Sequence, residues 1–128
     1  MALLTQVAEE IAAAIGGEVD YVPEYELGDF KAEKILVAPI GNEYNDLTRG
    51  GREVIISVEV GIIQRIKENN LPAMLEKVED MVQTIQNLKL VNGHGYVRKI
   101  TNTPAYDVQS MVSNKFFLTV MQVEVRVM

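Results

Sequence analysis

Two long segments of alternating apolar side chains constrain the fold of this chain most strongly. In residues 53–65 the apolar side chains at every second position are Val54, Ile56, Val58, Val60 and Ile62. Residues 114–128 repeat the pattern with Phe117, Met121, Val123, Val125 and Val127. A two-residue period predicts a strand with one buried face. Because both segments exceed the usual strand length of about five or six residues, we expect two unusually long strands.

Two other segments carry a helical period. In residues 2–15 the apolar side chains recur at steps of three and four, and Gly16-Gly17 follows as a stop signal. In residues 71–88 the apolar face is longer, and Asn69-Asn70 and Pro72 are typical of a helix start. Its members are Leu71, Met74, Leu75, Val78, Val82, Ile85 and Leu88. Met81 lies one step beyond this stripe, where it either widens the core or meets a partner.

Shorter strands are expected over residues 18–22, 35–40 and 96–100. Strand-to-strand connections dominate this order of elements, which favours a mainly antiparallel sheet. We therefore predict a single α+β domain over residues 1–128, with two amphipathic helices packed on one face of the sheet. Pro39 indicates that the strand at 35–40 lies at an edge or ends there.

Two features suggest a domain that is completed by its neighbours. Residues 41–52 have twelve residues of loop chemistry, which is long for a connection in so small a domain. The last segment ends in strand chemistry at Met128 without a polar tail, and an apolar strand left at a sheet edge invites pairing with another chain.

Composition excludes several classes of protein. The 128 residues are 48% hydrophobic and contain no cysteine, so disulfides, thiolate metal sites and thiol nucleophiles are absent. No apolar run approaches the ~20 residues of a membrane span, and the N-terminal residues lack the pattern of a secretory signal. We expect synthesis in the cytoplasm.

The net charge of −6 is unevenly distributed. Residues 1–64 contain four Lys or Arg and twelve Asp or Glu, and residues 65–128 contain eight and six. An acidic chain lacks the basic surface of nucleic-acid-binding proteins. The asymmetry suits head-to-tail contacts between copies, although simple solubility also explains it.

No catalytic constellation is visible in the sequence. His94 is the only histidine, and the acidic residues of segment 20–33 lack the alternating ligands and glycine of a calcium loop. Residues 48–52 resemble a phosphate-binding loop, but no Lys-Ser ending follows and a strand follows in place of a helix. We therefore expect no catalytic, cofactor-binding or metal-binding residues, and no cofactor.

The order of elements resembles that of the tail terminator (tail completion) proteins of long-tailed bacteriophages. The most similar parts are Asn102-Thr-Pro-Ala-Tyr106 and the terminal strand Asn114-Lys-Phe-Phe-Leu-Thr-Val-Met-Gln-Val-Glu-Val-Arg126. The resemblance covers essentially the whole chain, and it is one of architecture without an invariant motif. Related neck and minor tail proteins share it.

This resemblance implies a non-enzymatic homo-oligomer, a hexameric ring in the tail or neck of a virion assembled in the host cytoplasm. One face of such a ring would cap the tail tube protein and end polymerisation, and the other would dock the head-completion or stopper protein. The loop at 41–52 would face the lumen or the tube, with Tyr44, Arg49 and Arg52 as candidate partner-binding residues.

Two alternatives remain open on the sequence. The first is another neck, baseplate or minor tail protein. The second is a small ligand-binding domain or enzyme with a pocket between sheet and helices. Such an enzyme would have only carboxylates, lysines and tyrosines as candidate catalytic groups.

Overall fold

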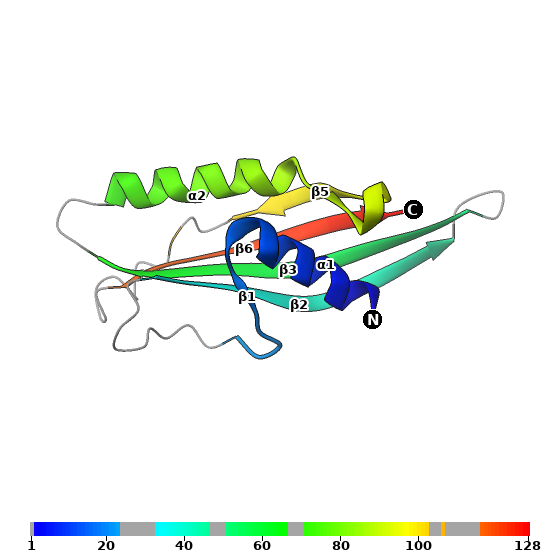
Figure 1. Ribbon diagram of the computed structural model, residues 1–128, viewed down its shortest axis with the longest axis horizontal. Helices are drawn as coiled ribbons and strands as arrows, with labels where there is room; N and C mark the ends of the chain where they lie inside the picture. Colours follow the sequence, from blue (N-terminus) through cyan, green and yellow to red (C-terminus); the bar gives the residue numbers. More distant parts are fainter. Residues whose placement is uncertain (1, 24–32, 47–50, 67–70, 103–105, 107–115) are drawn as a thin grey trace.

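The computed structural model describes residues 2–23, 33–46, 51–66, 71–102, 106 and 116–128. Within them, a sheet and two α-helices form two layers, with both helices on the same face of the sheet (Figure 1). The first half of the chain forms α1 (Leu3–Ile15), β1 (Glu18–Val19), β2 (Glu33–Asp46) and β3 (Arg52–Arg65). The second half forms α2 (Leu71–Gln86), β4 (Lys89–Leu90), the 3₁₀ turn η2 (Val91–Gly93), β5 (Gly95–Thr101) and β6 (Phe116–Val127).

The prediction of a mainly antiparallel sheet is wrong, because the sheet is mixed. The strand order is β1-β2-β3-β6-β5-β4, and β1 runs parallel to β2 through Glu18↔Leu36 and Val19↔Val37. Parallel neighbours need a connection of about a dozen residues, and residues 20–32 supply that length between β1 and β2. The prediction rested on the order of elements, which does not show whether two successive strands run parallel.

The expectation that the terminal strand lies at a sheet edge is also wrong. β6 pairs with β3 from Phe116 to Val127 on one side and with β5 from Gln122 to Val127 on the other. Its apolar alternation reflects burial at the centre of the sheet, since Phe117, Met121, Val123 and Val125 have no exposed surface. From Gln122 to Val127 the terminal strand therefore has a neighbouring strand on both sides.

The prediction of a loop at 41–52 is wrong for the residues that the structure describes, because they belong to a β-hairpin. Gly41 to Asp46 extend β2 and Arg52 begins β3, with Asp46 paired to Arg52. The register shifts between Pro39 and Gly41, where Ile40 forms a bulge. The polar composition of 41–46 misled the prediction, because a hairpin end without a covering layer has polar side chains on both faces.

The helix expected over 2–15 is observed as α1, and it ends at Gly16 with a φ of 71°. This left-handed conformation favours glycine. The next residue, Gly17, permits close packing of the helix end on β2, because a Cβ there would lie 2.9 Å from Cγ2 of Ile35. The two glycines thus end the helix and seat its last turn on the sheet.

The core lies between the helices and one face of the sheet. Val7, Ala8 and Ile11 of α1 belong to the same buried cluster as Val78 and Ile85 of α2. Met81 is 8% exposed and belongs to it too, so this residue widens the core. Among the described residues, no helix is long and apolar enough to span a membrane.

Candidate functional site

The β2–β3 hairpin extends past the N-terminal end of α1 and past the end of β6 (Figure 1). Each strand has fourteen residues and a length of about 45 Å. Because β3 is paired with β6 from Val54 to Arg65, only the end of the hairpin projects beyond β6 as an arm. Near its end, Asn42, Glu43 and Tyr44 are exposed. The arm is anchored at its other end, where Ile62 of β3 is fully buried in the core. An arm that is fixed at one end and exposed at the other is suited to contact another molecule.

The structure describes two of the three residues that the sequence proposed for partner binding. Tyr44 lies in β2 opposite Val54 and is 72% exposed. Arg52 begins β3, and its Nε lies 3.5 Å from Oδ1 of Asp46, with both side chains more than 80% exposed. Tyr44 and Arg52 therefore share the hairpin end. Arg49 lies outside the described residues.

A polar cluster occupies the sheet face opposite the helices, near the base of the exposed hairpin end. Arg126 of β6 lies between two strands, with Nε 2.6 Å from Oε2 of Glu53 and Nη1 donating to the Tyr96 hydroxyl at 2.9 Å. Asn45 donates from Nδ2 to Glu53 Oε1 at 3.4 Å. Arg98 of β5 lies 4.0 Å from Glu124. The cluster links four adjacent strands across the sheet.

The environment of Arg126 holds it as a cation. The hydrogen bond with Tyr96, followed by the charge of Glu53, raises the pKa of Arg126 above its usual value against the opposing effect of partial burial. The Glu53 side chain is only 12% exposed. A carboxylate at that depth is stabilised by a nearby cation. The pair therefore joins β3 to β6 electrostatically.

Glu53, Tyr96, Arg98 and Arg126 line an open hollow of about 320 Å³. The polar cluster was not predicted from the sequence, because its members come from four strands and none belongs to a local motif. The alternation in β6 did place Arg126 and Glu124 on the face opposite the apolar side chains. Only the strand order brings Glu53 and Tyr96 beside them.

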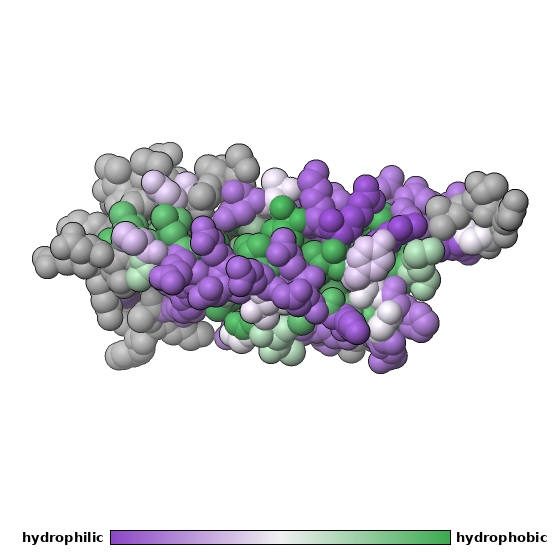
Figure 2. All heavy atoms as spheres, turned by 90° about the horizontal axis from the view of Figure 1, so that it is seen from above, coloured by the Kyte–Doolittle hydropathy of each residue, from purple (hydrophilic) through white to green (hydrophobic). Residues whose placement is uncertain are grey.

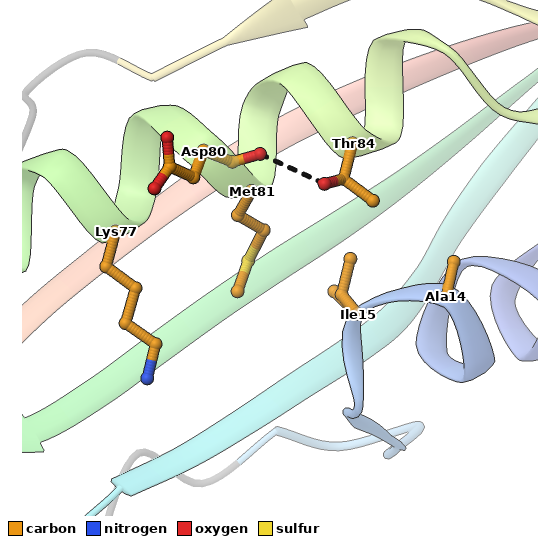
Figure 3. A pocket seen from close by; sticks show the side chains of 6 residues that line it. All are labelled: Ala14, Ile15, Lys77, Asp80, Met81 and Thr84. Atoms are coloured by element: carbon orange, nitrogen blue, oxygen red, sulfur yellow. Dashed lines mark hydrogen bonds between the residues drawn. The ribbon is translucent and has the colours of Figure 1, made fainter.

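A second hollow, of about 230 Å³, lies between the C-terminal end of α1 and the middle of α2. Ala14 and Ile15 line it from α1, and Lys77, Asp80, Met81 and Thr84 line it from α2 (Figure 3). The Thr84 hydroxyl donates to the carbonyl oxygen of Asp80 at 3.1 Å within α2. The Lys77 ammonium pairs with Glu33 of β2, which also accepts from Gln64 at 2.7 Å. The charged groups here hold α2 to the sheet.

The described residues offer little chemistry for catalysis. Among them, no group of three or more His, Asp or Glu side chains could hold a metal ion. His94 is exposed, and its backbone joins the turn to the end of the chain by accepting from Met128 N–H at 3.2 Å. The described part of the surface seen in Figure 2 carries mainly hydrophilic side chains, with hydrophobic atoms between them.

Comparison with solved structures shows a likeness in fold, while the sequence comparisons show none. No protein-family model and no curated protein sequence matches the chain. Among solved structures, the fold is similar to that of a chain in the virion of a native gene transfer agent (GTA) particle, with a TM-score of 0.55 and 13% sequence identity. The match covers 98% of this chain and 94% of that one. The two chains therefore share a fold over almost their whole length.

Proposed function

We propose that this protein is a structural component of a phage-like virion, and that it acts as a tail terminator. In this role copies of the chain form a ring, of six subunits in the proposed form, at the end of the tail tube. One face of the ring ends polymerisation of the tube protein, and the other docks the head-completion or stopper protein. The chain performs no catalysis and needs no cofactor in this role.

The observation that carries the proposal is the end-to-end likeness in fold to a virion chain. The match covers 98% of this chain and 94% of the other. Fold alone does not determine function. The site must therefore support the role as well.

The exposed hairpin supports an assembly role. Tyr44 combines a large amphipathic side chain with 72% exposure at the end of a paired strand. Tyrosine and arginine are enriched among residues that dominate protein interfaces. Because main-chain pairing holds β2 and β3 together up to Asp46↔Arg52, the arm keeps its shape before binding, which lowers the entropic cost of association.

Two alternatives give different expectations. Another neck, baseplate or minor tail protein would use the same fold at a different place in the particle. A ligand-binding protein or enzyme would use the hollow beside Arg126, whose volume of about 320 Å³ falls within the range of small-molecule pockets. The Arg126 guanidinium is already engaged by Glu53 and Tyr96, however. We therefore favour the structural role.

Electron microscopy of particles assembled without this protein tests the proposal. A terminator that is absent should leave tails of uncontrolled length or tails that do not join heads. Complementation with the intact chain should restore joined tails of uniform length. Tails of normal length that are joined to heads would refute the terminator role. Normal tails with a defect confined to the distal tip would favour a baseplate protein.

A further inference from the structure

The two long edges of the sheet differ in charge and are both open over part of their length. Among the described residues, β1 covers β2 only at Leu36 and Val37, so the outer edge from 38 to 46 has no neighbouring strand. β4 covers β5 only at Gly95 and Tyr96, so the edge from 97 to 101 has none either. Open edges of this kind are templates for pairing with another chain.

The charges on these two open segments are opposite. Segment 38–46 of β2 contains Glu43 and Asp46 and no basic residue. Segment 97–101 of β5 contains Arg98 and Lys99 and no acidic residue. Edges of like charge repel when they are paired, and edges of unlike charge attract. Two β2 edges would therefore repel each other, as would two β5 edges, whereas a β2 edge and a β5 edge would attract.

Strand direction allows the two edges to join in a continuous sheet. β2, β3, β6 and β5 are successive antiparallel neighbours, so β2 and β5 run in opposite directions. When β5 of one copy lies beside β2 of the next copy in the same orientation, the new pair is also antiparallel. The helices of both copies then remain on the same side of the extended sheet.

The register identifies the side chains that would meet. On the face opposite the helices, one row crosses the sheet through Glu43, Ile55, Arg126 and Tyr96. The adjacent row on the same face ends at Lys99 on β5, opposite Glu124. Glu43 and Lys99 thus lie on one face, at opposite edges and in neighbouring rows.

β4 already occupies the edge beside Gly95 and Tyr96, so a neighbouring β2 must shift along the strand toward 97–101. A shift of about four residues clears the two positions that β4 occupies and places Glu43 diagonally opposite Lys99, with both side chains on the same face. Strand stagger of this kind is required when sheets close into curved or circular assemblies. Neither Glu43 nor Lys99 has an ion-pair partner among the described residues.

We propose that copies of this chain associate head to tail by joining the open edge of β2 to the open edge of β5, with Glu43 of one copy facing Lys99 of the next. The proposal rests on the proposed ring-forming function and specifies its subunit interface. Such a contact uses two different surfaces and is heterologous, so it generates a closed ring or a filament according to the rotation between subunits.

Charge reversal at the two positions tests this interface by sedimentation velocity at low salt. The wild-type chain should form oligomers, and Glu43→Lys or Lys99→Glu alone should raise the dissociation constant at least about tenfold. An equimolar mixture of the two variants should assemble again, because each interface in an alternating assembly then pairs unlike charges. The double variant should also assemble by itself. Glu79→Lys, on the exposed surface of α2, is the control and should assemble like the wild type.

The outcomes separate this interface from the function it serves. Single variants that assemble normally, or a mixture that fails to recover, would overturn the Glu43–Lys99 contact while leaving the ring and the terminator role untouched. A wild-type chain that stays monomeric up to about 100 μM at low salt would overturn edge-to-edge assembly of the free protein. Circular dichroism of each variant distinguishes loss of assembly from loss of folding. Particle microscopy tests the terminator role independently.

Discussion

The Glu10 carboxylate of α1 accepts the backbone N–H of Val91, with the nitrogen 3.2 Å from Oε2 and 3.3 Å from Oε1. The two residues lie 81 positions apart in the sequence. Val91 has a φ of 52°, and the following Asn92 has a φ of 55°. A β-branched residue in this left-handed region is strained by about 1–3 kcal/mol. Glu10 therefore helps to hold a strained turn beside the end of β6.

Replacement of Glu10 should destabilise the fold through this contact. Glu10→Ala removes a charged acceptor from a partly buried N–H, and we expect the free energy of unfolding to fall by about 1–2 kcal/mol. Glu10→Gln retains a hydrogen-bond acceptor, so its free energy of unfolding should fall by less. Urea unfolding measures the difference, with the exposed neighbour Glu9→Ala as a control that should change stability by less than about 0.5 kcal/mol. Equal losses for Glu9 and Glu10 would contradict this assignment.

The backbone of Val91 should reverse the usual ranking of alanine and glycine. Both substitutions remove the same partial packing against the core, but only glycine adopts a positive φ without strain. We expect Val91→Gly to be more stable than Val91→Ala by about 1 kcal/mol. At the exposed helical position Ala73, Ala73→Gly should instead lose about 1 kcal/mol. Thermal or urea unfolding of the three variants measures these differences in stability. If Val91→Ala is more stable than Val91→Gly, the turn relaxes to a conformation without positive φ.

In the polar cluster, replacing each of the two arginines should lower stability to a different extent. Arg126→Ala leaves the Glu53 carboxylate without its cation at 12% exposure, so the urea midpoint should fall clearly. Arg98→Ala should lower it much less, because this side chain is 52% exposed and its ion pair spans 4.0 Å. Tyr96→Phe removes only the acceptor of the Arg126 hydrogen bond and should have an intermediate effect. Equal midpoints for Arg126→Ala and Arg98→Ala would show that the Glu53 pair is not stabilising.

The direction of the Arg126 pKa shift determines how the stability contributed by the Arg126–Glu53 pair depends on pH. The pKa of Arg126 is raised in the folded state, so the stability it contributes is fully present below the unfolded-state pKa and is lost only as pH rises through the folded value. From about pH 6 to 9, Arg126 itself should add no slope. The deficit of Arg126→Ala relative to wild type should therefore be constant over that interval in urea unfolding. A deficit that shrinks within it would indicate that another titrating group controls the pair.

Hydrophobic periodicity predicted the elements that bury one face. The helices expected at 2–15 and 71–88 are observed as α1 and α2, and the segments at 53–65 and 114–128 as β3 and β6. These segments are long, and their period follows directly from which side chains face the core. Their neighbours in the sheet are set by tertiary contacts that leave no local pattern. The central position of β6 and the parallel pairing of β1 were therefore not predictable by this reasoning.

The candidate site was predicted only in part for a related reason. Tyr44 and Arg52 were chosen because they lie in a polar segment, and the structure places both at the exposed hairpin end. The segment itself was assigned as a loop, because polar composition cannot distinguish a loop from a strand pair without a covering layer. The cluster around Arg126 depends on the register of four strands, which the sequence leaves unspecified.

The hairpin end should bind a partner without contributing to stability. Tyr44→Ala and Arg52→Ala each remove a side chain that is largely exposed, and the Arg52–Asp46 pair at the surface adds little. We expect the free energy of unfolding to change by less than about 0.5 kcal/mol, while affinity for the tail tube or the head connector falls at least about tenfold. Co-sedimentation with purified tubes, and with connectors, measures each affinity separately. Tyr21→Ala, at 63% exposure and away from the exposed hairpin end, is the matched control that should bind normally. Loss of folding in Tyr44→Ala would show that the residue is structural, and unchanged affinity for both partners would remove the hairpin end from the interface.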